Sequence, residues 1–90
     1  MKIEFDRAKR IATLGNRGLD MALADEIFAG NTITVEDGRL EYGEKRFITV
    51  GLLESRMVVL VWTPRGEARR IISMRKANAR EQKICQGRLV

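Results

Sequence analysis

Histidine is missing from this 90-residue sequence altogether, and cysteine and proline each occur only once. The absence of histidine removes the commonest general base, the Ser-His-Asp and Cys-His catalytic arrangements, and zinc sites of the Cys/His kind. The single cysteine, Cys85, cannot form an internal disulfide, which is typical of a protein in a reducing, cytoplasmic setting. Any catalysis must therefore use carboxylates, lysine or arginine, hydroxyl groups or one thiol, and we expect no metal and no cofactor.

Long apolar segments are also absent. No apolar run reaches the roughly 18 residues of a membrane span, and no charged segment leads into the apolar core of a secretory signal. One proline and eight glycines give no sign of disorder or of a fibrous repeat. The length predicts one domain, residues 1–90, with a modest core that a partner chain would extend.

Acidic residues are scarce in the second half of the chain. Residues 45–90 hold eleven basic and three acidic side chains, a net charge of +8, whereas residues 20–44 hold seven acidic and one basic. A basic half is typical of a surface that binds phosphates, and an acidic stretch suits a basic partner. The alternative is a solvated surface whose charge is merely uneven.

Three segments have helical periodicity, residues 6–15, 20–30 and 78–86. Asp6 and Asp20 are suitable N-caps, and Gly15-Asn16 and Gly30 are expected to end the first two helices. Asn78 and Glu81 have the spacing of a capping box at the start of the third helix, which Gly87 is expected to end.

Between the helices the periodicity becomes that of β-strands. TITVE and RLEY, residues 32–36 and 39–42, predict a hairpin across an Asp-Gly turn. Later strands are expected at KRFITVGLL, RMVVLVWT and EARRIISMR, with turns at Glu54-Ser55 and in TPRG, residues 63–66. With the short hairpin counted as the first strand and EARRIISMR as the fourth, the expected fold is α+β, with two N-terminal helices, a four-stranded antiparallel sheet and a C-terminal helix.

Strand alternation divides the side chains of residues 69–76 between two faces. One face would carry Arg70, Ile72, Met74 and Lys76, and the other Arg69, Ile71, Ser73 and Arg75. We expect the face with Ser73 and Arg75 to line an open groove, ringed by Arg46, Arg65 and Arg80. The planar fork of a guanidinium matches phosphate oxygens two at a time. The alternative for each arginine is a stem that covers apolar surface and a head in water.

Four segments together resemble the BrnT toxins of bacterial type II toxin–antitoxin modules, which share the fold of RelE-type ribonucleases. They are FDRAK, ALADEIF, GEKRFITVGL and VVLVWTPRGEARRIISMRKANARE, residues 5–9, 22–28, 43–52 and 58–81. The last is the most specific, with a strand ending in Thr, a charged turn, RIIS, a second Arg and a Glu-bearing helix. The resemblance implies a RelE-like fold and an endoribonuclease that arrests growth until a cognate antitoxin binds. It also implies a BrnA-like, ribbon-helix-helix antitoxin through which the complex binds operator DNA.

The chain departs from the family at three positions. Arg17 stands where relatives usually have His, Thr13 where they have Asn, and Cys85 where they have Tyr. The alternative function is therefore a catalytically weak or inactive relative that binds an antitoxin or a nucleic acid. A DNA-binding regulator acting alone is disfavoured, because the sequence contains no dedicated recognition element.

Metal-independent RNA cleavage by the 2′-hydroxyl of RNA needs a base, charge stabilisation on the phosphorane and a proton for the leaving oxygen. Arg70 and Arg75 match the arginines of the family's RIIS-x-R run, and Arg75 is favoured for stabilising charge. Glu44 is a candidate base, and Lys76 is a candidate base or acid. Glu81 is a further candidate base, for which helix capping is preferred. The RNA-binding candidates are Arg46, Arg65, Arg69 and Arg80.

Two aromatic residues and the cysteine complete the candidates. Trp62 and Tyr42 have the ring faces needed to stack on RNA bases, with a core role preferred for Trp62. Cys85 has no histidine partner as a nucleophile and is expected to be a small buried group. We expect the antitoxin to dock on the acidic stretch, residues 20–44, or on an exposed sheet edge.

Overall fold

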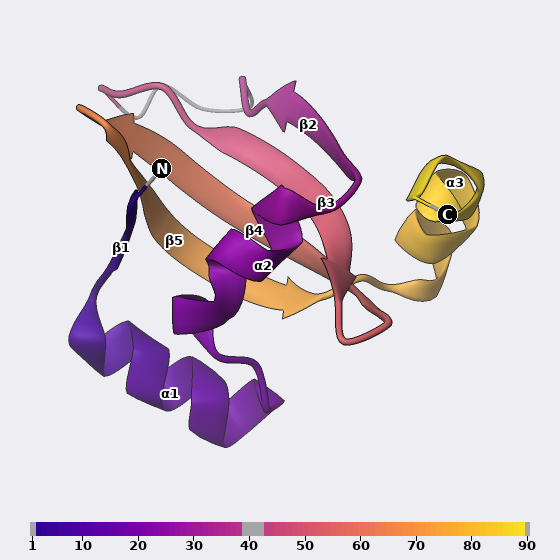
Figure 1. The fold of residues 1–90 in the computed structure, drawn as a ribbon, viewed down its shortest axis with the longest axis horizontal. Helices are drawn as coiled ribbons and strands as arrows, with labels where there is room; N and C mark the ends of the chain where they lie inside the picture. Colours follow the sequence, from indigo (N-terminus) through magenta and orange to yellow (C-terminus); the bar gives the residue numbers. More distant parts are fainter. Residues whose placement is uncertain (1, 39–42, 90) are drawn as a thin grey trace.

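A computed structural model of the protein describes residues 2–38 and 43–89. These residues form a twisted five-stranded sheet and three α-helices (Figure 1). The elements are β1 (Lys2–Phe5), α1 (Arg7–Arg17), the 3-10 turn η1 (Met21–Leu23), α2 (Ala24–Ala29), β2 (Thr32–Glu36), β3 (Phe47–Leu53), β4 (Arg56–Arg65), β5 (Ala68–Lys76) and α3 (Ala79–Leu89). None of the helices within the described ranges is long and apolar enough to cross a membrane.

The sheet has five strands and is mixed, so the expectation of four antiparallel strands is wrong. Its order is β1-β5-β4-β3-β2, with β1 parallel to β5 and the other neighbours antiparallel. The missed strand, KIEF, has only four residues and carries two charges. Its two apolar residues, Ile3 and Phe5, nevertheless alternate with the charged residues and pack against the main core. In the sheet, this N-terminal strand lies beside β5, the last strand along the chain.

The first and third helices begin where their caps predict, and both end later than expected. The second does not begin as predicted, because Asp20 caps the 3-10 turn η1 and α2 begins at Ala24 without a side-chain cap. The side chain of Asp6 accepts a hydrogen bond of 3.0 Å from the backbone N–H of Lys9, which caps α1. The helix continues past Gly15-Asn16 and ends at Gly18, whose φ of +68° is the left-handed conformation that glycine adopts readily. The last helix likewise runs past Gly87 to its end at Leu89.

The strand TITVE pairs with β3. The register runs from Thr32 opposite Gly51 to Glu36 opposite Phe47. RLEY, residues 39–42, which the sequence predicts as its hairpin partner, lies outside the described residues. Gly51 lies close to α2, since a Cβ atom at this position would stand 2.6 Å from Cγ2 of Ile27.

One predicted turn is confirmed and another is displaced. Glu54 and Ser55 join β3 to β4 and both have positive φ angles, 50° and 69°. The TPRG segment is not the turn, because β4 continues through Pro64 to Arg65, which pairs with Ala68. The chain reverses instead at residues 66–67.

A β-bulge in β5 breaks the simple alternation expected for residues 69–76. Val61 pairs with Ser73, but the next residue, Trp62, pairs with Ile71, which leaves Ile72 as the extra residue. Ile71 and Met74 consequently belong to the same core cluster. The division of side chains assigned from the sequence is therefore wrong across the bulge.

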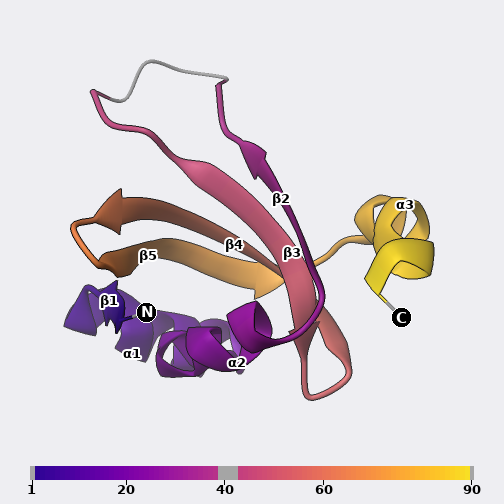
Figure 2. The same cartoon turned by 45° about the horizontal axis from the view of Figure 1, so that its top comes forward.

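Two apolar clusters pack on opposite faces of the sheet, here termed the α2 face and the α3 face. The larger, on the α2 face, contains Leu19, Met21, Ala24, Ile27, Leu53, Val58, Leu60, Ile71 and Met74. The smaller, on the α3 face, contains Val50, Val59, Ala77, Cys85 and Leu89. Figure 2 shows α1 and α2 together below the sheet and α3 apart from them at its end.

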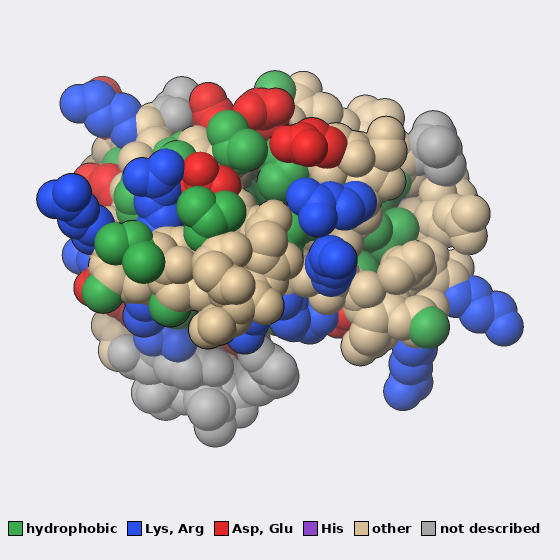
Figure 3. Space-filling model, turned by 90° about the horizontal axis from the view of Figure 1, so that it is seen from below, with side chains coloured by type: hydrophobic (Ala, Val, Ile, Leu, Met, Phe, Trp, Pro, Cys, Tyr) green, Lys and Arg blue, Asp and Glu red, His purple; other side chains and the backbone are tan. Residues whose placement is uncertain are grey.

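No residue of α1 is buried. In the view from the α1 side, green apolar side chains lie exposed among blue Lys and Arg side chains (Figure 3).

Candidate functional site

Several of the candidate arginines project from the α3 face. Arg75 pairs with Val59, whose side chain belongs to the cluster beneath α3. Arg70 pairs with Thr63. Thr63 lies four positions from Val59 along β4, so the two side chains are on the same face. Arg65 lies two residues beyond Thr63 on the same strand and points to the same side.

Glu44 joins Arg46 to Arg65 at one corner of this face. Its Oε2 lies 3.4 Å from Nε of Arg46, and its Oε1 lies 3.6 Å from Nη2 of Arg65. The buried hydroxyl of Thr63 donates a 2.7 Å hydrogen bond to the carbonyl oxygen of Lys45, which fixes the backbone between Glu44 and Arg46. We call Glu44, Arg46, Arg65 and the neighbouring Arg70 the corner cluster.

Arg75 stands apart from the corner cluster. Arg65 lies six positions along β4 from Val59, the residue opposite Arg75, a distance of about 20 Å along a strand. Arg70 leans toward β1, with its Nη1 3.8 Å from Oε1 of Glu4. The guanidinium groups therefore share a face but do not converge on one pocket, in contrast to the ring expected from the sequence.

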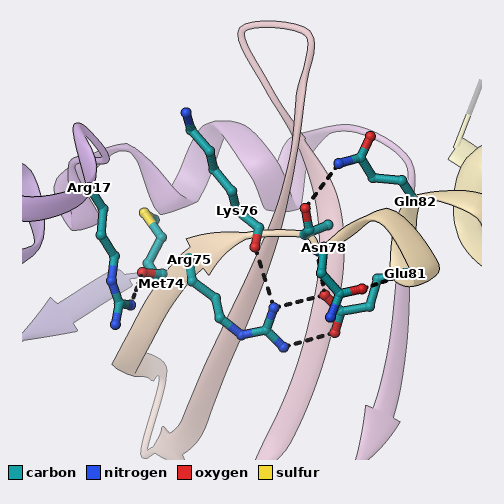
Figure 4. A network of polar contacts seen from close by, with 8 residues as sticks. Arg17, Met74, Arg75, Lys76, Asn78, Glu81 and Gln82 are labelled. Carbon is teal, nitrogen blue, oxygen red and sulfur yellow. Dashed lines mark hydrogen bonds and ion pairs between the residues drawn. The ribbon is translucent and has the colours of Figure 1, made fainter.

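Arg75 forms a bidentate ion pair with Glu81 of α3 (Figure 4). Its Nη1 and Nη2 lie 2.7 Å and 2.8 Å from the two carboxylate oxygens, and Nη1 also donates to the carbonyl oxygen of Lys76 at 3.3 Å. The same carboxylate accepts from the backbone N–H of Asn78, whose side chain accepts from the N–H of Glu81, each at 2.8 Å. The capping box predicted for α3 is thus confirmed, and it shares its carboxylate with Arg75.

The charge state of Glu81 follows from these contacts. The hydrogen bonds from Arg75 lower the pKa of Glu81 to about 2, against the opposing effect of partial burial, and the N–H of Asn78 adds to the lowering. A carboxylate with so low a pKa is a weak proton acceptor at neutral pH. Capping and ion pairing, the preferred role, describe this residue better than base catalysis.

Arg69 lies on the α2 face, away from the other candidate arginines. Its guanidinium carbon stands 4.0 Å from the centroid of the Phe28 ring and 5.2 Å from that of Trp62. Its Nε is buried and has no hydrogen-bond partner within the described residues. Trp62 packs against the larger core cluster and donates to Thr49 Oγ1 at 2.8 Å. Arg69 is therefore placed to stack on aromatic rings, and the core role preferred for Trp62 is confirmed.

The remaining candidates lie elsewhere. Lys76 pairs with Val58 of the α2-face cluster, and Figure 4 shows its side chain pointing away from that of Arg75. Arg80 is exposed on the first turn of α3. Cys85 is buried, as expected. Tyr42, a candidate for base stacking, lies outside the described residues.

Three of the described acidic residues of the stretch 20–44 lie in different environments. Asp20 is bound by Arg10 at 2.8 Å, Asp37 is buried, and Glu44 belongs to the corner cluster. The Arg10 guanidinium lowers the pKa of Asp20. Across residues 2–38 and 43–89, no group of three or more His, Cys, Asp or Glu side chains is placed to hold a metal ion.

Two of the positions at which the chain departs from the resembled family are neighbours in space. Thr13 and Arg17 line a cleft of about 240 Å³ between α1 and β5, together with Ser73. Nη1 of Arg17 donates to the carbonyl oxygen of Met74 at 2.8 Å. No local pattern predicts this contact, because 57 residues separate its two partners.

A family model built from known proteins matches most of the chain. The family model described as "Ribonuclease toxin, BrnT, of type II toxin-antitoxin system" matches residues 5–81. No curated protein matches the chain. The matched range includes the corner cluster, Arg75 and Glu81, and it stops in the first turn of α3.

Proposed function

Because the chain belongs to the BrnT family of ribonuclease toxins from type II toxin–antitoxin systems, we propose that it cleaves cellular RNA on its α3 face and thereby arrests growth. The observation that carries this proposal is the placement of Arg46, Arg65, Arg70 and Arg75 on one side of the sheet. An RNA chain of several nucleotides would be needed to reach from the corner cluster to Arg75.

The ion pairs of the corner cluster do not prevent phosphate binding. The ion pairs of Arg46 and Arg65 with Glu44, and of Arg70 with Glu4, have N–O distances of 3.4–3.8 Å between partly exposed groups. Such pairs contribute about 0–1 kcal/mol to stability. A phosphate offers a guanidinium two oxygens with matching geometry and releases counterions from RNA, so it competes well with loosely held carboxylates. Binding should therefore weaken steeply as the salt concentration rises.

We place the chemical step at the corner cluster, because a carboxylate there lies beside two guanidinium groups. Glu44 removes the proton of the 2′-hydroxyl, whose oxygen attacks phosphorus while the bond to the 5′-oxygen breaks. The leaving oxygen takes its proton from water, which gives a 2′,3′-cyclic phosphate and a 5′-hydroxyl end. Arg46 and Arg65, with Arg70 beside them, stabilise the charge on the phosphorane, an effect of about 3–4 kcal/mol per donor. The step uses no metal ion, and Lys76 has no part in it.

A second candidate places the scissile phosphate at Arg75. The bidentate contact with Glu81 fixes the orientation of this guanidinium in advance, which favours stabilisation of a developing charge. Glu44 cannot serve a phosphate held there, since the two residues lie at opposite ends of the face. The two candidates therefore predict different effects of substitutions at Glu44 and Arg75.

The remaining proposals concern partners. Type II toxins have a protein antitoxin, and we propose that this one is a BrnA-like ribbon-helix-helix protein through which the complex binds operator DNA. We propose a cytoplasmic location, where cellular RNA is found. The alternative is an inactive relative that only binds its antitoxin or a nucleic acid, and the departures at Thr13, Arg17 and Cys85 favour it.

Induced expression in bacteria, with and without the neighbouring gene, tests the proposal. We expect growth arrest and new RNA 5′ ends without the neighbour, and recovery with it. The purified chain should cut RNA in the presence of EDTA. Normal growth at high expression of folded protein, with no RNA fragments, would select the inactive relative.

A further inference from the structure

The amphipathic helix α1 presents its apolar side to solvent. Ile11 is 65% exposed and Leu14 is 46% exposed, although they lie three residues apart and form one stripe. The half-buried residues of α1 are Arg10 and Thr13. An amphipathic helix of a globular protein normally turns its apolar stripe to the core and its polar side outward.

Polar contacts attach α1 to the rest of the protein. Arg10 binds both carboxylate oxygens of Asp20, at 2.8 Å and 3.1 Å, and its guanidinium carbon lies 5.7 Å from the centroid of the Phe5 ring. At the other end of the helix, Arg17 donates to the carbonyl oxygen of Met74. These contacts hold the polar side of α1 against the domain and leave Ile11 and Leu14 available for a second molecule.

The charge around the stripe defines the partner. The helix sequence RAKRIATLGNR has four basic residues and no acidic residue. Asp20 offsets the charge of Arg10, while Arg7, Lys9 and Arg17 add positive charge along the rest of the helix. A molecule that covers the stripe must therefore bring apolar side chains together with negative charge.

We propose that Ile11, Leu14 and the adjoining Arg7 form a docking surface for an acidic, amphipathic segment of the antitoxin. This inference rests on the proposed function only in taking the partner to be an antitoxin. RNA fits the surface less well, because exposed isoleucine and leucine do not complement a phosphate chain. A second copy of the chain would bring like charges together, which opposes association.

This docking surface is separate from the RNA-binding face. The helix α1 lies with α2 on one side of the sheet (Figure 2). The strand register places the arginines of the corner cluster on the other side. Substitutions in the stripe should therefore affect antitoxin binding without removing any group proposed to contact RNA.

The test uses isothermal titration calorimetry to measure how tightly the full-length chain binds the protein encoded by the neighbouring gene. The variants are Ile11→Asp and Leu14→Asp, with Ile84→Asp as the control, because Ile84 lies on α3 and is 64% exposed. We expect each α1 variant to bind at least about tenfold more weakly, as for central interface residues, and the control to bind as the unsubstituted chain does. Circular dichroism should show all three variants folded, since none of these side chains is buried.

Several results would overturn the inference. They are unchanged binding by both α1 variants, an equal loss in Ile84→Asp, and no binding by the unsubstituted chain. Weaker RNA binding by the α1 variants, with antitoxin binding intact, would make the stripe an RNA surface. A dimer of the chain alone that Ile11→Asp dissociates would make it a self-interface. RNA cleavage by each variant without the partner is measured separately, so that loss of activity in every chain counts against the proposed function alone.

Discussion

The guanidinium of Arg17 donates to the carbonyl oxygen of Met74 at 2.8 Å, at a point where β5 pairs with β4 on one side but no longer with β1 on the other. The parallel strand β1 pairs with β5 only as far as Ile71. Beyond that residue the edge of the sheet is open, and an open edge offers hydrogen-bonding groups to other chains. Arg17 occupies one of these groups and ties the end of α1 to the sheet.

Replacement of Arg17 by leucine should loosen α1. The substitution keeps an apolar stem but removes the donor, so we expect a loss of about 1 kcal/mol in the free energy of unfolding. Backbone amides of α1 should exchange with deuterium faster, while those of β3 and β4 are unchanged. Unchanged exchange throughout α1 would show that the Arg17 contact does not hold the helix.

The ion pair between Arg75 and Glu81 should make the stability of the protein depend on pH. The pKa of Glu81 is about 2 in the folded protein, below its ordinary value of 4.5, so its contribution is complete above pH 4.5 and is lost as the pH falls toward 2. The exposure of Arg75 reduces the effect through solvent screening. We expect a contribution of about 1–2 kcal/mol at neutral pH.

Glu81→Gln isolates this contribution, because glutamine keeps the capping hydrogen bond and removes the charge. Urea unfolding of both proteins should show the unsubstituted chain more stable at pH 7 and the difference shrinking between pH 4.5 and 2. A difference that stays constant over this range would contradict the charge pair as its source.

Glu44→Gln and Arg75→Ala distinguish the two candidate sites of cleavage. If the chemical step lies at the corner cluster, Glu44→Gln should lower kcat by about 10²–10⁴-fold and leave RNA affinity nearly unchanged. Arg75→Ala should then weaken RNA binding and change kcat little. Arg88→Ala, in the last turn of α3, serves as a charge-matched control. The opposite result, a silent Glu44→Gln and a loss of kcat in Arg75→Ala, would move the scissile phosphate to Arg75.

Two glycine-to-alanine substitutions should change stability in opposite directions. At Gly51 the new methyl group would stand 2.6 Å from Cγ2 of Ile27, and overpacking of this kind costs about 1–3 kcal/mol. At Gly87, inside α3, no atom beyond the local helix backbone and the adjacent residues lies within 4 Å of the new group, and alanine favours the helix by about 0.5–1 kcal/mol. Thermal unfolding of both variants measures the difference. Equal effects would contradict a close approach of α2 to β3.

Local signals in the sequence predicted local structure well. The caps at Asp6 and Asp20 and the capping box at Asn78 each depend on residues within one helical turn, and all three are present, although Asp20 caps the 3-10 turn η1 and not α2. The missed strand β1 depends on pairing with a segment more than sixty residues away. A four-residue strand with two charges has too weak a pattern to be recognised without that partner.

The candidate site shows the same division. Residue type was enough to select the arginines, but their placement depends on register and on the bulge at Ile72. Composition does not tell Arg69, stacked on Phe28, from Arg70, which faces the other side of the sheet. The contact between Glu44 and Arg65 could not be predicted without the fold either, because it joins the segment before β3 to the end of β4.

The burial of Cys85 beneath α3 provides a native reporter of motion. It is the only thiol in the chain and is 9% exposed, so a thiol-reactive dye can label it only when α3 lifts away from the sheet. The labelling rate then measures how often this opening occurs. If RNA draws Arg75 away from Glu81, labelling of Cys85 should become faster. RNA binding could then be followed without any engineered probe.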